Sequence, residues 1–401
     1  MPAYVVGTFD TKGAELRYLA DTIAAAGVEV VTVDVGTSRT AGAADVGATE
    51  VAAHHPDGAD SVWSDDRGAA ITAMSTALVE FVRSRSDLAG IIGAAGSGGT
   101  ALVTPAMQAL PVGVPKVMVS TVASGDVAPY VGPADIAMMY SVTDVAGINR
   151  ISRVVLANAG NALVGMMQGS TPVDRRDGDL PALGLTMFGV TTPLVTRLVE
   201  QLDDRFDPLV FHATGTGGRS MEKLVDSGMI AGVVDMTTTE IADHVVGGVF
   251  SAGPDRLGAI SRTGVPYVGS VGAVDMVNFG GVDSVPSRFA NRHLHVHNPH
   301  VTLMRTTADE NVEIGRFIAE QLNRCDGPVH VLLPTGGVSL LDAPGQPFHD
   351  PNADDALFST IEATLRTTSD RSVERVDANI NDIEFGDRVL EVVGAMMGAP
   401  T

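Results

Sequence analysis

Cysteine is almost absent from this chain, and long apolar runs are missing. Cys325 is the single cysteine in 401 residues, which excludes an internal disulfide framework and a zinc site built from cysteines. No apolar run reaches the roughly 18 to 20 residues of a membrane-spanning helix, and the N-terminus lacks the basic start of a signal peptide. We therefore expect a cytoplasmic protein with no membrane partner.

Positive charge is also scarce. The formal net charge is −22 and the isoelectric point is near 4.6, which argues against a nucleic-acid partner, because neutralising the phosphates of a nucleic acid needs a basic face. A local basic pocket remains compatible with this charge. Only Lys12, Lys116 and Lys223 are lysines, whereas arginine fills the other basic positions. A retained lysine indicates a need for a compact ammonium group, unless the three survive by chance. Two of them lie beside glycine-rich turns.

Short apolar runs alternate with helical stretches, a pattern typical of parallel sheets with crossover helices. We expect strands at residues 3–6, 29–33, 88–93, 116–120, 182–187 and 209–212, and helices at residues 12–26, 71–83, 101–110, 149–169, 193–202 and 220–227. The polar segment 170–180 predicts a boundary between domains 1–175 and 180–401. The fold class predicted is α/β, with two Rossmann-like doubly wound parallel-sheet subdomains.

A glycine-bounded turn, Gly7-Thr8-Phe9-Asp10-Thr11-Lys12-Gly13, links the first predicted strand to the first predicted helix. Anions gather at such positions, because a helix start offers unpaired amides and the positive end of its dipole. The two threonines supply hydroxyl groups, and Lys12 supplies a charge for a phosphate oxygen. Asp10 either holds Mg²⁺ or a ribose hydroxyl, or it only caps the helix.

Two further loops follow strands of the same predicted sheet. Gly96-Ser97-Gly98-Gly99-Thr100 suits a phosphate cradle, with a simple tight turn as the alternative, and it matches neither a Walker A loop nor GxGxxG. Ser120-Thr121-Val122-Ala123-Ser124-Gly125-Asp126 adds hydroxyls and a candidate metal carboxylate. We expect these loops, with Gly36 after the second strand, to surround a nucleotide whose Mg²⁺ binds Asp10 and Asp126.

The second half repeats the combination of glycine, hydroxyl and isolated charge in its loops. This composition suits a small oxyanionic ligand such as a carboxylate or phosphate, although Glu222 and Lys223 also fit a solvated helix face. The residues predicted for this second anion or substrate site are Gly215, Thr216, Gly217, Gly218, Arg219, Glu222, Thr238, Glu240, His295 and His297.

Histidines cluster between residues 292 and 300. Strand alternation places His293, His295 and His297 on one face, close enough for a metal or for acid–base chemistry, with structural hydrogen-bonded histidines as the alternative. Arg305 is a candidate clamp for a carboxylate. The proline-containing loop 342–350 is too specific in residue type for a simple linker.

The glycine and hydroxyl motifs of the first half resemble those of the Tm-one-like ATP-binding family, which includes the inhibitory domain of a tomato mosaic virus resistance protein. The resemblance continues through residues 141–151, 212–219, 251–256, 295–299 and 342–348, and so spans nearly the whole chain. It implies two Rossmann-like subdomains, bound ATP with Mg²⁺, and a homodimer or higher homo-oligomer. It supplies no agreed reaction, and we do not transfer virus inhibition.

Our leading hypothesis is a bacterial metabolic enzyme that uses ATP and Mg²⁺ in the first half and a small anionic metabolite in the second, with the site at loops between the halves. One alternative is a nucleotide-sensing module without catalysis, whose ATP-ordered dimer is read by a partner protein. A second alternative ignores nucleotide and places the chemistry at His295 and His297.

Overall fold

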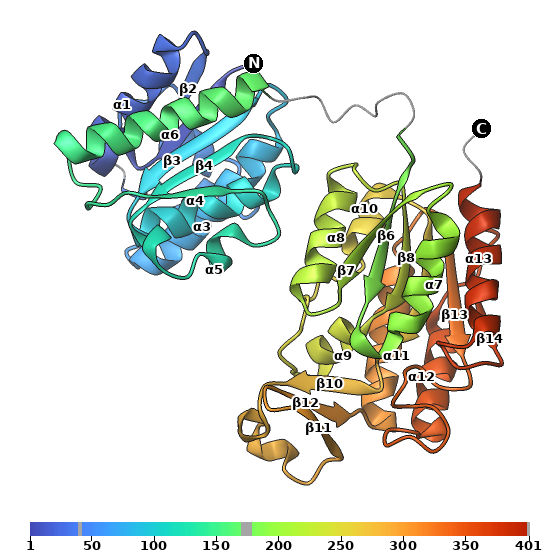
Figure 1. The fold of residues 1–401 in the computed structure, drawn as a ribbon. Coiled ribbons are helices and arrows are strands. Elements are labelled where there is room, and N and C mark those ends of the chain that lie inside the picture. Colours follow the sequence, from blue (N-terminus) through green and yellow to red (C-terminus); the bar gives the residue numbers. More distant parts are fainter. Residues whose placement is uncertain (39–41, 170–178, 399–401) are drawn as a thin grey trace. The chain divides into compact units, whose positions relative to one another are not determined.

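The chain forms two compact units, Met1–Asp174 and Arg175–Thr401 (Figure 1). The structure, a computed structural model, describes residues 1–38, 42–169 and 179–398. Residues 170–178 of the predicted boundary segment 170–180 lie outside the described residues. Both units are α/β, with a parallel sheet flanked by helices, which confirms the predicted fold class.

The first unit is built on a five-stranded parallel sheet of order β2-β1-β3-β4-β5. Its strands are β1 (Ala3–Gly7), β2 (Val30–Asp34), β3 (Gly90–Ala95), β4 (Lys116–Ser120) and β5 (Ala137–Tyr140). Strand β1 lies between β2 and β3, so the chain moves outward from β1 to β2 and then crosses back to β3. The loops after β1 and β3 therefore flank the point where the strand order reverses.

Helices cover both faces of this sheet. They are α1 (Phe9–Ala25), α2 (Ala48–Ala52), η1 (Ala59–Val62), α3 (Arg67–Arg83), α4 (Ser97–Ala109), η2 (Thr121–Ser124), α5 (Ala128–Val131) and α6 (Arg150–Gly169). Helices α1 and α6 pack together on one face, and α3 and α4 pack together on the other. Successive side chains of β1 point to opposite faces of the sheet. Ala3 and Val5 pack in the core under α1 and α6, whereas Tyr4 and Val6 pack in the core under α3 and α4.

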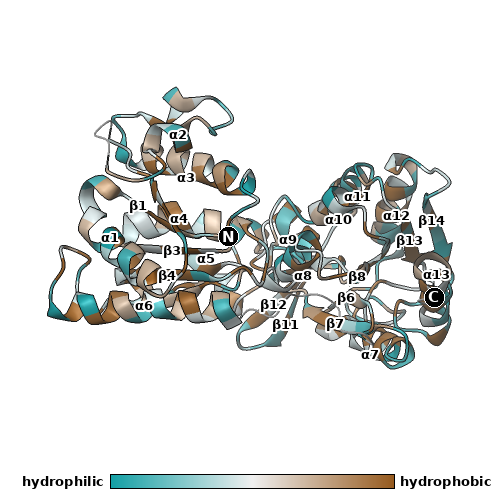
Figure 2. Cartoon of the chain, turned by 90° about the horizontal axis from the view of Figure 1, so that it is seen from above, coloured by the Kyte–Doolittle hydropathy of each residue, from teal (hydrophilic) through white to brown (hydrophobic). Residues whose placement is uncertain are grey.

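The helices are amphipathic, as the alternating colours along α6 show in Figure 2. Its buried side includes Leu156 and Leu163, whereas Arg153 and Asn161 face outward. Among the described residues, no helix is both long and apolar enough to cross a membrane.

The second unit has a six-stranded parallel sheet of order β14-β13-β9-β8-β6-β7. Its strands are β6 (Ala182–Met187), β7 (Asp207–His212), β8 (Gly232–Thr237), β9 (Tyr267–Gly272), β13 (Val329–Pro334) and β14 (Arg371–Val376). Counted along this sheet, the first strand lies between the second and third, as in the first unit. The two halves therefore share a strand order.

Helices again cover both faces of the second sheet. Helices α7 (Thr192–Leu202) and α13 (Ile383–Met397) cover one face. The other face carries α8 (Thr216–Asp226), α9 (Thr239–Val246), α10 (Gly258–Thr263), α11 (Ala308–Leu322) and α12 (Pro351–Thr364). Short 3-10 turns complete the unit: η3 (Gly189–Thr191), η4 (Val282–Ser284) and η5 (Ser287–Phe289).

A three-stranded antiparallel sheet is inserted in the second unit. The sequence analysis predicted a strand with the histidines but did not predict this sheet. Its order is β10-β12-β11, with β10 (Met276–Phe279), β11 (Leu294–Asn298) and β12 (Val301–Arg305). An apolar cluster joins it to the loop after β6, through Phe188, Met276, Leu303 and Phe348. This cluster fills space with the chain's own side chains beside the carboxyl end of β6.

Four helices begin three or four residues earlier than predicted. Helix α4 begins at Ser97 instead of residue 101, and α8 begins at Thr216 instead of residue 220. Helices α1 and α3 likewise begin at Phe9 and Arg67. Their first turns consist mainly of glycine, hydroxyl and charged residues, which carry no apolar period. The glycine-rich segments are therefore the first turns of the helices themselves.

Candidate functional site

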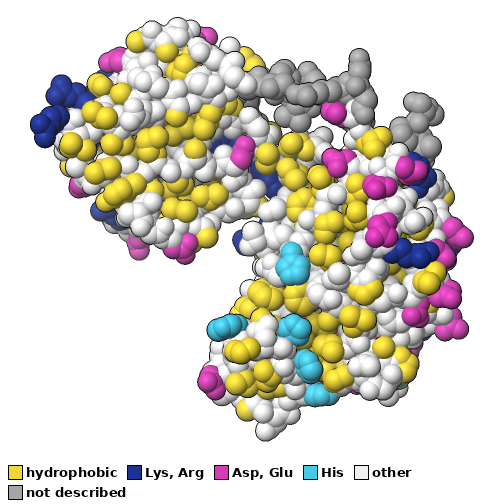
Figure 3. Space-filling model, in the orientation of Figure 1, with side chains coloured by type: hydrophobic (Ala, Val, Ile, Leu, Met, Phe, Trp, Pro, Cys, Tyr) yellow, Lys and Arg dark blue, Asp and Glu magenta, His cyan; other side chains and the backbone are white. Residues whose placement is uncertain are grey.

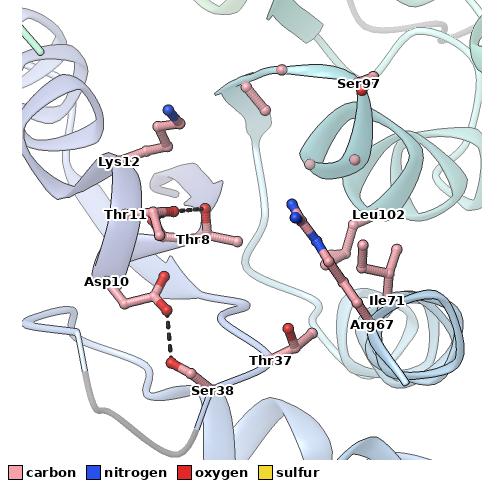
Figure 4. A pocket seen from close by; sticks show the side chains of 14 residues that line it. Thr8, Asp10, Thr11, Lys12, Thr37, Ser38, Arg67, Ile71, Ser97 and Leu102 are labelled. Carbon is pink, nitrogen blue, oxygen red and sulfur yellow. Dashed lines mark hydrogen bonds between the residues drawn. The ribbon is translucent and has the colours of Figure 1, made fainter. Parts of the chain in front are cut away.

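A polar pocket of about 440 Å³ lies at the carboxyl ends of β1, β2 and β3 in the first unit (Figure 4). The loop after β1, the loop after β2, the start of α3 and the start of α4 all contribute to it. The residues that line it are Thr8, Asp10, Thr11, Lys12, Thr37, Ser38, Arg67, Ile71, Ala95, Gly96, Ser97, Gly98, Gly99 and Leu102. The structure thus brings the first and second predicted loops to one pocket.

The loop after β1 presents its side chains at an irregular start of α1. Lys12 departs from helical geometry, with φ −124° and ψ 18°, and its ammonium donates to the carbonyl oxygen of Val145. The hydroxyls of Thr8 and Thr11 are 2.8 Å apart, so they form a hydrogen-bonded pair at the pocket. Gly13 is buried behind them, and does not line the pocket.

Asp10 does not cap a helix. The N-cap of α1 is Thr8, and among the described residues no backbone N–H donates to the Asp10 carboxylate. Its Oδ2 instead accepts a hydrogen bond of 2.7 Å from the hydroxyl of Ser38. Gly36 lies directly beside it, since a Cβ at Gly36 would come within 3.3 Å of the carboxylate of Asp10. The capping alternative for Asp10 is therefore wrong.

The start of α4 supplies backbone amides. Its N-cap is Gly96, and no side chain of the described residues caps the helix, so the amides of the first turn, residues 97–99, keep the free N–H groups of a helix start. Thr100 lies behind this turn, fully buried, with its hydroxyl 2.6 Å from that of Ser120. This helix start is chemically suited to an anion, because its dipole adds to the open N–H groups.

Arg67 is a pocket residue that sequence reasoning missed. Its guanidinium extends into the pocket between the loop after β1 and the start of α4 (Figure 4), and its Nη2 lies 3.9 Å from a Cβ built on Gly98. A sequence signal existed: Asp66 caps α3 by accepting from the N–H groups of Gly68 and Ala69, which makes Arg67 the first helical residue. A cation there opposes the helix dipole, so its position indicates a role outside the helix.

The third predicted loop does not line the pocket. Thr121 lies behind the second loop, 3.8 Å from a Cβ built on Gly96, whereas Ser124, Gly125 and Asp126 are exposed elsewhere. Asp126 accepts a hydrogen bond of 3.0 Å from the N–H of Ala128, as a local turn carboxylate does. The structure therefore does not bring Asp126 together with Asp10 in the pocket lining.

The glycine turn of the second unit is occupied by the chain's own carboxylate. Glu240 Oε1 accepts hydrogen bonds from the N–H groups of Gly215 at 2.6 Å and Gly218 at 3.0 Å. A Cβ on Gly218 would lie 1.9 Å from Glu240, and one on Gly217 would lie 1.9 Å from the His212 carbonyl. These glycines are needed to pack internal groups, which corrects their predicted role in holding a ligand.

Glu222 and Glu240 belong to a buried ion cluster around Arg256. The guanidinium contacts Glu222 at 3.1 Å, Asp235 at 2.8 Å and Glu240 at 3.0 Å, and all four side chains are less than a tenth exposed. Burial raises the pKa of the Glu222 carboxyl, despite the adjacent guanidinium. Neither the predicted ligand-binding role of these glutamates nor the solvated-face alternative for Glu222 is correct.

The remaining loop residues of the predicted second site also serve internal contacts. Arg219 Nε donates to the Gly215 carbonyl at 3.1 Å, and the buried Thr238 hydroxyl donates to the Ser270 carbonyl at 3.2 Å. Thr216 is the first residue of α8. The glycine turn, moreover, follows the edge strand β7, which is the second strand of its sheet, whereas its counterpart in the first unit follows the third strand. The two turns are therefore not equivalent in topology.

Histidines gather on the second unit, near the three-stranded sheet (Figure 3). The rings of His293 and His295 both pack edge-on against Phe348, at centroid distances of 5.3 and 6.0 Å. The pairing of β11 shifts register between Val296 and Asn298, so His297 lies at an irregularity. Within residues 1–38, 42–169 and 179–398, no group of three or more His, Cys, Asp or Glu side chains is arranged to hold a metal.

Arg305 clamps carboxylates of its own chain. Its guanidinium contacts Asp342 at 3.2 Å and Asp354 at 2.8 Å, and it also donates to the carbonyl oxygens of Phe348 and Asp350. The side chain is only 5% exposed. Arg305 does bind carboxylates, as predicted, but they belong to this chain and their contacts hold the loop 342–350 in place.

Comparisons with known proteins cover both units. Residues 1–172 match the N-terminal domain, and residues 180–397 match the C-terminal domain, of the uncharacterised protein family UPF0261. A UPF0261 protein of Mesorhizobium japonicum is 56% identical over 387 residues, which cover 96% of this chain and 97% of the relative. A UPF0261 protein of Clostridium tetani is 47% identical over 394 residues, with 95% of each chain covered.

A plant protein is similar over the same length. The ToMV resistance protein Tm-1(GCR237) of Solanum lycopersicum is 43% identical over 412 residues, which cover 97% of this chain and 55% of the tomato protein. The match includes both units, so the resemblance noted in the sequence is a homology along the chain. This chain belongs to the UPF0261 family and is a homologue of the tomato resistance protein.

Proposed function

We propose that the first unit of this UPF0261 protein binds ATP together with Mg²⁺ in the pocket between β1 and β3. The observation that carries the proposal is the convergence of two cationic side chains, Lys12 and Arg67, with the uncapped start of α4. Open amides and positive charge around one polar cavity favour a phosphorylated ligand. The resemblance to an ATP-binding family selects ATP among such ligands.

The pocket also suits the rest of a nucleotide. Its volume lies within the range of about 300 to 1,000 Å³ that small-molecule sites occupy. Ile71 and Leu102 supply an apolar surface for a base, and hydroxyl groups line the remainder. Mg²⁺ prefers hard oxygen ligands and keeps several waters, so it enters with the phosphates and needs few protein groups. The threonine pair Thr8 and Thr11 offers such oxygens.

The reaction we favour is transfer of a phosphoryl group to a small anionic metabolite. Such transfer relies on positioning and charge stabilisation more than on protein nucleophiles, and Lys12 and Arg67 would stabilise the charge on the phosphates. The metabolite would bind beside those phosphates, since Glu240 fills the glycine turn of the second unit. The second candidate is a nucleotide sensor without catalysis. It is favoured because the described residues that line the pocket include one carboxylate and no histidine, and so offer few groups for acid–base catalysis.

Calorimetric titration tests the binding proposal. We expect MgATP to bind the wild-type chain, and a Lys12→Ala, Arg67→Ala double variant to bind at least about 100-fold more weakly, because each charged hydrogen bond contributes about 1.5 to 3 kcal/mol. Arg153→Ala, an exposed arginine of α6 outside the pocket lining, is the matched control and should bind as the wild type does. Absence of binding, or equal binding by the double variant, would refute the proposal.

ADP formation from ATP in the presence of small carboxylic acids separates the two candidates, because transfer of the γ-phosphoryl group to an acid leaves ADP and no free phosphate. Turnover that depends on one of these acids supports the transferase. Tight binding of MgATP with no turnover for any acid supports the sensor, in which ATP orders a homodimer that a partner protein reads.

A further inference from the structure

The pocket has two chemically different ends. Lys12 and Ser97, with the start of α4, lie at one end, whereas Asp10, Thr37 and Ser38 lie at the other, beside the end of β2 (Figure 4). The first end attracts anions. The second end carries the Asp10 carboxylate, which repels a phosphate, and its oxygens, like the hydroxyl oxygens beside it, accept hydrogen bonds from neutral donors.

Asp10 keeps one free oxygen at this second end. Its Oδ2 accepts from the Ser38 hydroxyl at 2.7 Å, whereas its Oδ1 has no hydrogen-bond partner among the described residues. Neither Lys12 nor Arg67 forms an ion pair with it in the described part of the chain. Ser38, having donated its proton to Asp10, can only accept a further hydrogen bond. Together they present two neighbouring acceptors.

The acidic residue at the end of β2 cannot perform this task. In many dinucleotide-binding folds a carboxylate near that position binds ribose hydroxyls. Here Asp34 is fully buried, and it accepts from the N–H groups of Phe9, Gly36 and Gly42 at 2.9 to 3.0 Å. Its oxygens are therefore committed to the backbone. Gly36, which has no side chain, allows the Asp10 carboxylate to lie close to this loop.

We propose that Asp10 and Ser38 bind the vicinal diol of a ribose, so that the pocket selects ribonucleotides over deoxyribonucleotides. Two adjacent hydroxyls donate two hydrogen bonds, one to Asp10 Oδ1 and one to Ser38 Oγ. This inference rests on the proposed nucleotide site and fixes the direction of the ligand, with the sugar toward β2 and the phosphates toward α4. It also assigns Asp10 to the sugar, not to Mg²⁺.

The test compares MgATP with its 2′-deoxy and 3′-deoxy analogues by calorimetry. The wild-type chain should bind MgATP at least about tenfold more tightly than either analogue, because removal of one hydroxyl leaves a charged or polar acceptor without its partner. Asp10→Asn should weaken MgATP binding toward that of the deoxy analogues, and it should leave nearly unchanged the binding of the analogue that lacks the hydroxyl bound to Asp10. Ser38→Ala should remove part of the preference for MgATP over the deoxy analogues. Asp21→Asn, an exposed carboxylate of the same helix, should keep it.

Each alternative result has a distinct meaning. Equal binding of ATP and both deoxy analogues by the wild-type chain would overturn the ribose assignment while leaving the ATP site intact. Equal weakening of all three ligands by Asp10→Asn, with loss of the Mg²⁺ dependence, would place Asp10 at the metal and also overturn it. If no nucleotide binds to the wild-type chain, the proposed function itself fails. Circular dichroism of each variant verifies that it has folded.

Discussion

Glu240 places its carboxylate oxygen 2.6 Å from the backbone nitrogen of Gly215, within the glycine turn that opens α8. In effect the chain supplies its own anion to this turn. A similar glycine-rich segment of the first unit, at the start of α4, has no such internal carboxylate among the described residues, and its residues line a pocket. Similar glycine-rich strings thus serve packing in one unit and line a pocket in the other.

The first prediction concerns this internal anion. Glu240→Ala should lower the free energy of unfolding of the second unit by about 3 kcal/mol, because it leaves two buried amides and part of a guanidinium without an acceptor. Glu240→Gln keeps an oxygen at the same place and should lose less. Denaturant titration measures both. Binding of MgATP to the folded variants should not change, and a loss of ATP affinity in Glu240→Gln would contradict this assignment.

A second prediction concerns Lys12, which lies at the end of the pocket away from Ser38. Lys12→Ala should weaken the binding of ATP about tenfold and the binding of AMP no more than about twofold, because the ammonium group contacts the distal phosphates. Titration calorimetry with both nucleotides provides the comparison. An equal loss for ATP and AMP would show that the lysine acts only by holding the Val145 carbonyl.

A third prediction separates stability from binding at two adjacent glycines. A Cβ on Gly98 would lie 3.6 Å from Ile71 and 3.9 Å from Arg67, in ordinary contact and within the pocket. Gly98→Ala should therefore raise the free energy of unfolding by about 0.5 to 1 kcal/mol, through helix propensity, and weaken ATP binding. Gly99→Ala should destabilise the protein instead, because its Cβ would lie 2.6 Å from that of Ala95. Thermal unfolding should show a rise in stability for Gly98→Ala and a fall for Gly99→Ala, and calorimetry should show weaker ATP binding by Gly98→Ala.

A fourth prediction follows from the buried carboxyls around Arg305. Burial, followed by repulsion from Asp342, raises the pKa of Asp275 to about 7 and that of Asp354 to about 8. The folded state therefore binds more protons than the unfolded state between about pH 4 and 8, so stability is greatest at the acidic end of this window and falls as pH rises. We expect the second unit to lose at least about 2 kcal/mol between pH 5.5 and 8.5.

Denaturant titration across this range measures the effect. Asp354→Asn, which keeps a hydrogen-bond acceptor for Arg305, should reduce the dependence on pH. Stability that rises from pH 5.5 to 8.5 would contradict the assignment.

Sequence reasoning located the glycine-rich loops because their composition is local. The turn at Lys12 and the turn at Gly98 follow strands whose apolar runs are readable, and parallel strands place their carboxyl ends at one edge. Arg67 escaped notice because its helix was predicted to begin at residue 71, four residues later than it does. Ser38 escaped notice because only tertiary packing brings it to the pocket. Glu240 was predicted as a ligand-binding residue for the same reason: nothing local shows that its carboxylate meets the Gly215 turn, 25 residues away.

The antiparallel insertion was equally hard to predict. Its strands pair only through β12, and the loops between them carry no periodic pattern. The histidine alternation predicted one strand correctly, yet the register shift beside His297 depends on pairing with a neighbour. Contacts distant in sequence therefore account for most of what the sequence left open.

A crystal structure of the chain with MgATP tests the central claim most directly. The account predicts the phosphates against the amides of residues 97–99, between Lys12 and Arg67, with Glu240 still bound to Gly215. Nucleotide found in the second unit, with Glu240 displaced from its glycine turn, would contradict it.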